Sequence, residues 1–145
     1  MRVSKRLDYG VRALFELAAR QSGGPIQSRE IAQRQAIPEA YLHQLMAALA
    51  RAGMVQGTRG PSGGHRLVGD PATITLGQVY LALEGPNRRD HPHDADASSH
   101  AMGAAVVHAA WHELEQRSFA YLDSVTLADL VERARSVDEI VDYAI

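Results

Sequence analysis

The sequence predicts a mainly α-helical (α+β) protein, a winged helix-turn-helix with a long C-terminal dimerisation helix. Two short amphipathic segments around a tight break at residues 35–37 predict the helix-turn-helix. A glycine-rich turn between two short strand-like segments follows at once, and a hairpin in that place is a wing. Further on, a helical segment over 101–124 carries apolar residues on more than one face, which indicates burial on two sides.

The N-terminal half contains three helical segments with recognisable starts. Apolar residues recur at helical spacing over 4–20, and Ser4 is expected to cap that helix. Ser28 is expected to cap the second, a short helix whose acidic first turn suits the positive end of the helix dipole. Pro38 favours the start of a third helix over 38–52, because proline is preferred at the first helical position.

The end of the third helix leads directly into the predicted wing. Gly53 is expected to terminate the helix, with Met54 folding back against its last turn. Short strands are predicted at 55–58 and 65–68, and the run RGPSGG at 59–64 specifies the turn between them.

Capping signals divide the C-terminal half. Thr75 is expected to begin a helix that Gly-Pro stops at 85–86. The spacing Thr126-x-x-Asp129 predicts a short helix after the long one. Ser136-x-x-Glu139 has the spacing of a capping box, which predicts a further, final helix.

Composition limits the class of protein. Apolar residues make up 46% and charged residues 22% of the chain, which is typical of a folded domain rather than a disordered segment. No apolar stretch approaches the roughly 18 residues of a membrane span. The N-terminus also lacks the apolar core of a signal peptide. We therefore expect a cytoplasmic protein with no membrane partner.

The small net charge of −2 conceals two halves of opposite sign. Residues 1–70 contain ten basic and five acidic residues, a net of +5, whereas residues 71–145 carry a net of −7. A basic half indicates a polyanionic partner, with nucleic acid the leading candidate. Two solvated faces without a partner are the alternative interpretation.

The predicted third helix carries candidate DNA-reading side chains between its buried positions. Gln44 can bond adenine edges in the major groove, Glu39 can accept from cytosine, and His43 can donate or accept. Ala40 lies on the same face, and Tyr41 either reaches a phosphate or packs against the body. An ordinary amphipathic helix is the alternative, which the adjacent wing disfavours.

The wing and the N-terminus add backbone and minor-groove contacts. Arg59 at the wing tip suits a narrow minor groove, and the wing glycines let backbone N–H groups approach phosphates. The alternatives are a plain hairpin turn and a solvated, frayed N-terminus. The candidate DNA-binding residues are Arg2, Ser4, Lys5, Arg6, Ser28, Glu39, Ala40, Tyr41, His43, Gln44, Arg59, Gly60, Pro61, Ser62, Gly63 and Gly64.

Histidine and aspartate gather in a polar segment over 87–100 and in the helix after it. His108 and His112 have the i, i+4 spacing that can chelate a transition metal. His93 and Asp8 complete the set of candidate metal ligands. A flexible loop that carries polar residues for solvation is the stronger alternative, and sensing of pH by clustered histidines is a weaker one.

Several segments resemble the Rrf2 family of bacterial transcriptional regulators. They are MRVSKRLDYGVRAL, SREIAQRQAIPEAYLHQLMAALARAGMV, the wing TRGPSGGHRL, ITLGQVYLALEGP, the tryptophan at 111 followed by ELEQR, and LDSVTLADLV. Together they span about 1–132. The resemblance implies a homodimer, joined by the long helix, that binds palindromic promoter DNA. It also implies a DNA-binding domain over 1–86, a sensor loop over 87–100 and a dimerisation region over 101–145.

The resemblance breaks at the cofactor. Many family members hold an iron–sulfur cluster with three cysteines, and the corresponding positions here are His93, Ser99 and Ala105. His108 and Asp8 stand where some members use a histidine or a carboxylate ligand. The chain contains no cysteine, so it offers neither a cysteine-ligated cluster nor a disulfide or a cysteine nucleophile.

The sequence therefore predicts a dimeric, sequence-specific DNA-binding regulator. We expect a repressor that senses an effector through residues 87–112, or that responds to a partner protein or small ligand. A metal-responsive regulator that uses the histidine and aspartate residues is the alternative. A metal-dependent hydrolase is disfavoured because HExxH, an activated-serine motif and a nucleotide loop are absent, so we expect no enzyme.

Overall fold

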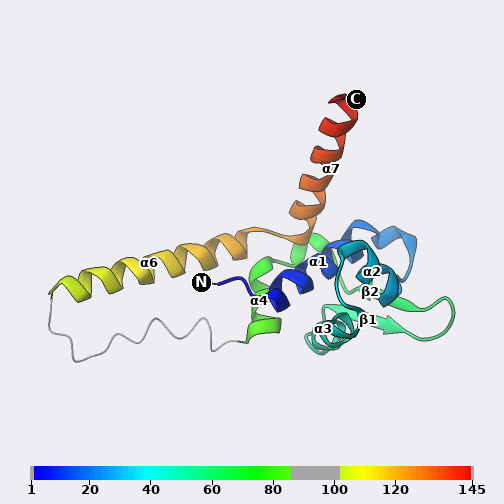
Figure 1. Cartoon of the computed structure of the whole chain (residues 1–145), viewed down its shortest axis with the longest axis horizontal. Helices are drawn as coiled ribbons and strands as arrows, with labels where there is room; N and C mark the ends of the chain where they lie inside the picture. The colour runs from blue at the N-terminus through cyan, green and yellow to red at the C-terminus, as the bar shows by residue number, and fades with distance from the viewer. Residues whose placement is uncertain (1, 86–101, 145) are drawn as a thin grey trace.

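The computed structural model describes residues 2–85 and 102–144. Their elements are, in chain order, α1 (Lys5–Ala19), η1 (Gln21–Gly23), α2 (Ser28–Gln35), α3 (Glu39–Arg51), β1 (Val55–Thr58), β2 (Gly64–Leu67), η2 (Pro71–Thr73), α4 (Leu76–Glu84), α6 (Met102–Ser124) and α7 (Leu127–Ala144). Elements α1 to α4 with the two strands form a compact body, from which α6 and α7 project in different directions (Figure 1). This architecture confirms the predicted winged helix-turn-helix with a long C-terminal helix.

One apolar core unites the body and the first turn of α7. Its fully buried large side chains are Leu14 and Leu17 of α1, Ile31 of α2, Leu42, Leu45, Met46 and Leu49 of α3, Val79 of α4 and Leu127 of α7. The ring of Tyr80 meets Phe119 edge to face at 5.3 Å, which attaches the C-terminal end of α6 to α4. Burial of these side chains supplies the main driving force for folding the body.

Local signals place several helix ends where the sequence predicts them. The Ser4 hydroxyl oxygen accepts the Leu7 N–H at 3.0 Å and caps α1. Gly53 has φ +76°, and the Met54 N–H reaches back to the Leu49 carbonyl at 3.0 Å. This is the glycine-terminated end expected for α3. The strand prediction is also confirmed, with β2 beginning and ending one residue earlier than expected.

Two predicted starts need correction. Ser28 does not cap α2, because it is the first helical residue and Gln27 occupies the cap position. The Ser28 hydroxyl instead forms a hydrogen bond with Nε2 of His65 at 2.7 Å. Pro38 precedes the first residue of α3, so it is the cap residue rather than the first helical residue.

The prediction of two short helices after α6 is wrong, because α7 is continuous over 18 residues. Thr126 and Asp129 do cap its start: each backbone N–H is bonded by the other side chain, at 2.9 and 3.1 Å. Ser136 caps nothing, since its hydroxyl donates to the Glu132 carbonyl one turn earlier at 3.1 Å. Between Asp129 and Ser136 the sequence has no glycine or proline that would end the helix.

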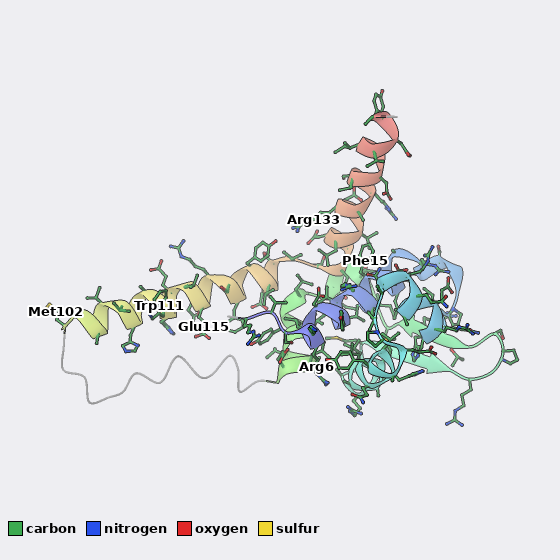
Figure 2. All side chains as sticks on the ribbon, viewed as in Figure 1. Arg6, Phe15, Met102, Trp111, Glu115 and Arg133 are labelled. Atoms are coloured by element: carbon green, nitrogen blue, oxygen red, sulfur yellow. The ribbon has the colours of Figure 1, made fainter. Side chains whose placement is uncertain are left out.

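Helix α6 has the predicted length, but within this chain it buries only Phe119. Met102 and Trp111 lie on the part that extends away from the body (Figure 2), and they are 84% and 51% exposed. The predicted polar loop over 87–100 lies outside the described residues. Within those residues, no helix is long and apolar enough to cross a membrane.

Candidate nucleic-acid interface

Helix α3 is the second helix of the helix-turn-helix, the position that a recognition helix occupies in this motif. It buries Leu42, Leu45 and their neighbours against the body, while Glu39, Ala40, His43 and Gln44 are exposed on the opposite side. The turn from α2 is tight because Ala36 takes a left-handed conformation with φ 52°. The Ile37 N–H then closes the turn on the Ala32 carbonyl at 2.9 Å. The candidate base-reading side chains therefore share one exposed face.

Helix α1 holds the turn between α2 and α3 through polar contacts that the sequence analysis does not identify. The Arg12 guanidinium donates to the backbone carbonyl of Gln35, the last residue of α2. The Gln35 side-chain amide in turn donates to the carboxylate of the buried Glu16 at 2.6 Å, and Arg34 lies 3.5 Å from the same carboxylate. A carboxylate among the buried positions of α1 is the sequence signal that points to this network.

Tyr41 packs rather than pointing away from the protein. Its ring meets Tyr9 of α1 edge to face at 5.8 Å, and Arg12 lies over the Tyr9 ring at 5.1 Å. Of the two roles open to Tyr41, the structure shows the packing role. The contact fixes the start of α3 against α1.

The wing depends on glycine at two crowded positions. A Cβ on Gly63 would lie 2.2 Å from the Thr58 carbonyl oxygen, so the backbone of the turn closes only around glycine. Gly64 has φ +148°, and a Cβ there would lie 2.6 Å from the carbonyl of Ile26, the segment just before α2. Arg59 and Gly60, with Pro61 and Ser62, are exposed at the tip.

A cleft of about 510 Å³ separates the wing from the two helices. Ser28 and Arg29 of α2, Glu39 and His43 of α3, and Arg59, Gly63, Gly64 and His65 of the wing are among its lining residues. Burial lowers the pKa of His65 below its ordinary value of 6.5, and nearby His43 lowers it further. Most of the predicted DNA-binding set from α2, α3 and the wing therefore surrounds one concave surface.

The four predicted residues at the N-terminus separate into two pairs. Ser4 donates its hydroxyl to the Glu84 carboxylate, and Nε of Arg6 donates to the Leu83 carbonyl at 3.0 Å. Both contacts fasten the start of α1 to the end of α4. Arg2 and Lys5 are exposed.

The candidate metal ligands do not come together within the described residues, where no group of three His, Cys, Asp or Glu side chains could hold an ion. Asp8 is paired with Arg12 at 3.1 Å, and His108 and His112 stand on the projecting part of α6. His93 and Ser99 lie outside the described residues. Ala105, the third position of the implied cluster, offers only a methyl group on α6. A conventional thiolate-held cluster does not fit this chain.

Comparison with known proteins assigns the fold and the family. The Rrf2 family, described as iron-dependent transcriptional regulators, matches residues 3–133. A Synechocystis protein named as an HTH-type transcriptional regulator from its sequence class is 39% identical over 136 residues, which cover 94% of this chain and 91% of that one.

Solved structures agree with this assignment. CymR, described as the global cysteine regulator of B. subtilis, superposes with a TM-score of 0.78 at 32% identity, over 92% of this chain and 98% of its own. IscR of T. potens gives 0.75 at 35% identity, over 92% and 88%. These relatives are transcriptional regulators rather than enzymes. The chain therefore belongs to the Rrf2 family of DNA-binding transcriptional regulators.

Proposed function

We propose that the protein represses transcription by binding a specific promoter site as a homodimer. The observation that carries the proposal is the shared concave surface, with the exposed face of α3 on one side and Arg59 of the wing on the other. In this arrangement α3 enters the major groove, where Glu39, His43 and Gln44 read base edges. Arg59 enters the neighbouring minor groove. Arg2 and Lys5 contact phosphates.

The test begins with selection of duplexes from a random library by the full chain. Arg59→Ala should weaken binding to the selected site about tenfold and relax preference at A·T-rich positions. Arg66→Ala removes the same positive charge from an exposed residue of β2, in the same wing, and is the matched control. Lys5→Ala should weaken all duplexes alike and reduce the salt dependence by about one counterion. Equal effects of Arg59→Ala and Arg66→Ala would refute the assignment of Arg59.

Dimerisation is proposed from the exposed apolar residues of α6. Val106, Val107, Trp111, Leu114 and Tyr121 are each about half exposed or more, which is costly for a helix in a small soluble protein. A second copy of α6 would cover them and place two recognition helices on successive turns of DNA, about 34 Å apart. We accordingly assign DNA binding to residues 1–86 and dimerisation to 101–145.

The single tryptophan makes this part directly measurable. Trp111 fluorescence should shift to longer wavelength on dilution as the dimer dissociates, and sedimentation should give a dimer at micromolar concentration. Leu114→Asp should yield a monomer with weakened DNA binding. Val68→Asp, at an exposed apolar residue of the body, is the matched control and should stay dimeric. A wild-type monomer at high concentration would refute the proposal.

We propose that the protein senses its effector through the region 87–112, or that it responds to a partner protein or a small ligand. The metal-responsive alternative uses His108 and His112, one helical turn apart, with His93 or Asp8 supplied from elsewhere. The metal and sulfide content of untagged protein distinguishes the metal-responsive regulator from a regulator that senses another effector. Stoichiometric metal that is lost in His108→Ala supports the metal-responsive regulator, and empty protein that still binds its promoter refutes it.

A further inference from the structure

The wing is attached to the helix-turn-helix by its second strand. His65 of β2 forms two backbone hydrogen bonds with Ile26, at 2.9 and 2.7 Å, just before α2 begins. The close approach of Gly64 to Ile26 brings the two segments together. The segment before α2 therefore adds a short antiparallel pairing to β2, so that the wing is held at its second strand as well as at its base.

A side-chain contact reinforces the same junction. Ser28, a buried residue of α2, lies with its hydroxyl 2.7 Å from Nε2 of His65. The other ring nitrogen, Nδ1, is buried and has no hydrogen-bond partner among the described residues. A buried nitrogen without a partner carries a desolvation cost, and the hydrogen bond at Nε2 helps to offset it.

The position of this pair explains why it matters for the wing tip. Each wing strand has four residues, and a two-stranded hairpin of that size is marginally stable by itself. Arg59 stands at its tip, facing the cleft that Arg29, Glu39 and His43 also line. A wing that moves freely would have to lose that freedom on binding, and this lowers affinity.

We propose that the hydrogen-bonded pair Ser28–His65 acts as a latch. It fixes the wing against α2 and thereby holds Arg59 in a fixed position relative to the recognition helix α3. His65 is then a positioning residue for DNA binding, and its effect passes through Arg59. The inference rests on the proposed DNA-binding function and adds His65 as a determinant of affinity that acts by positioning Arg59.

The decisive experiment is a double-mutant cycle on the selected duplex. His65→Leu removes the ring nitrogens and should weaken binding by about tenfold in the wild-type background. In the Arg59→Ala background the same change should weaken binding less than about twofold. His65→Gln keeps a polar group within reach of Ser28 and should restore most of the affinity. Ser28→Ala should match His65→Leu, and the double variant should be no weaker than either.

A variant that merely destabilised the protein would weaken binding equally with and without Arg59. That outcome, or unchanged affinity in His65→Leu, would overturn the proposed role of the latch in DNA binding. Gln56→Leu, at an exposed position of β1, is the matched control and should leave affinity unchanged.

Hydrogen exchange of the free protein gives a readout that does not involve DNA. The backbone amides of Ile26 and His65 should exchange faster in His65→Leu and at the wild-type rate in His65→Gln, while amides of α1 are unaffected. Unchanged exchange of these two amides in His65→Leu would overturn the proposed role of the latch. If wild-type protein selects no duplex but the exchange pattern holds, the DNA-binding function fails and the structural junction stands.

Discussion

Helices α1 and α6 are both rich in apolar residues, yet they use them differently. α1 buries seven of its residues against the rest of the body, whereas α6, although longer, buries Phe119 alone. α7 repeats the contrast within one helix, since Leu127 is fully buried while Val137, Ile140 and Val141 are more than half exposed. The body completes its core within one chain. The projecting helices retain apolar surface that one chain does not cover, which supports the proposed second copy.

Truncation of one leucine in each region should show the largest difference between the body and the projecting helices. Leu45 of α3 is fully buried, so Leu45→Ala should lower the free energy of unfolding by about 2–5 kcal/mol. Leu114 of α6 is 53% exposed, so Leu114→Ala should change the unfolding of dilute protein by less than about 0.5 kcal/mol. Denaturant titration at low protein concentration measures both. Similar losses would mean that α6 has a core of its own.

The polar network beneath the helix-turn-helix should show the next largest effect. Glu16→Ala removes the buried acceptor of the Gln35 amide and should cost about 1–3 kcal/mol. Glu132→Ala on α7 breaks only an exposed pair with Arg135 at 3.9 Å and should cost less than about 0.5 kcal/mol. Thermal unfolding of the two variants gives the comparison. A loss for Glu132→Ala as large as that for Glu16→Ala would show that the projecting helix is held as tightly as the body.

The elements of the body could be predicted because their signals are local. Ser4, Gly53 and the RGPSGG turn each act on the few residues beside them, and each lies where the sequence places it. The contacts that position the site join residues distant in sequence, such as Ser28 with His65 and Glu16 with Gln35. Spacing along the chain carries no information about such partners, so the sequence predicts for Ser28 a local capping role that it does not have.

The predicted break of α7 at Ser136 is wrong for a different reason. Thr75-x-x-Gln78 and Ser136-x-x-Glu139 have the same spacing, but only the first is a capping box in the structure. A cap needs an extended residue before the helix, and Thr75 has that conformation with ψ 156°. Ser136 follows a run of good helix formers over 132–135, so the backbone continues as helix and the Ser136 hydroxyl bonds one turn back.

These two look-alike boxes give a matched pair of small substitutions. Thr75→Ala removes the hydroxyl that accepts the Gln78 N–H at 3.2 Å, and should cost about 1 kcal/mol. Ser136→Ala replaces a mid-helix serine by the best helix former and should be neutral or stabilising by about 0.5 kcal/mol. Chemical denaturation with far-UV circular dichroism measures both. A loss of stability in Ser136→Ala as large as that in Thr75→Ala would contradict the helix-interior role of Ser136.

The smallest expected effect is the pH dependence contributed by His65. Its folded pKa is lowered by burial, so between that value and the ordinary 6.5 the unfolded chain binds more protons than the folded one. Stability from this group is therefore complete above about pH 6.5 and is lost as the pH falls through the folded pKa. The groups that face the ring across the cleft include Arg29, Glu39, His43 and Arg59, and none of them is altered in His65→Gln. The free energy of unfolding should accordingly fall less steeply from pH 7 to 5 in His65→Gln than in wild type. If the free energy of unfolding fell equally with pH in wild type and His65→Gln, the ring would be open to water. The junction between the wing and α2 would then be looser than the rest of the body.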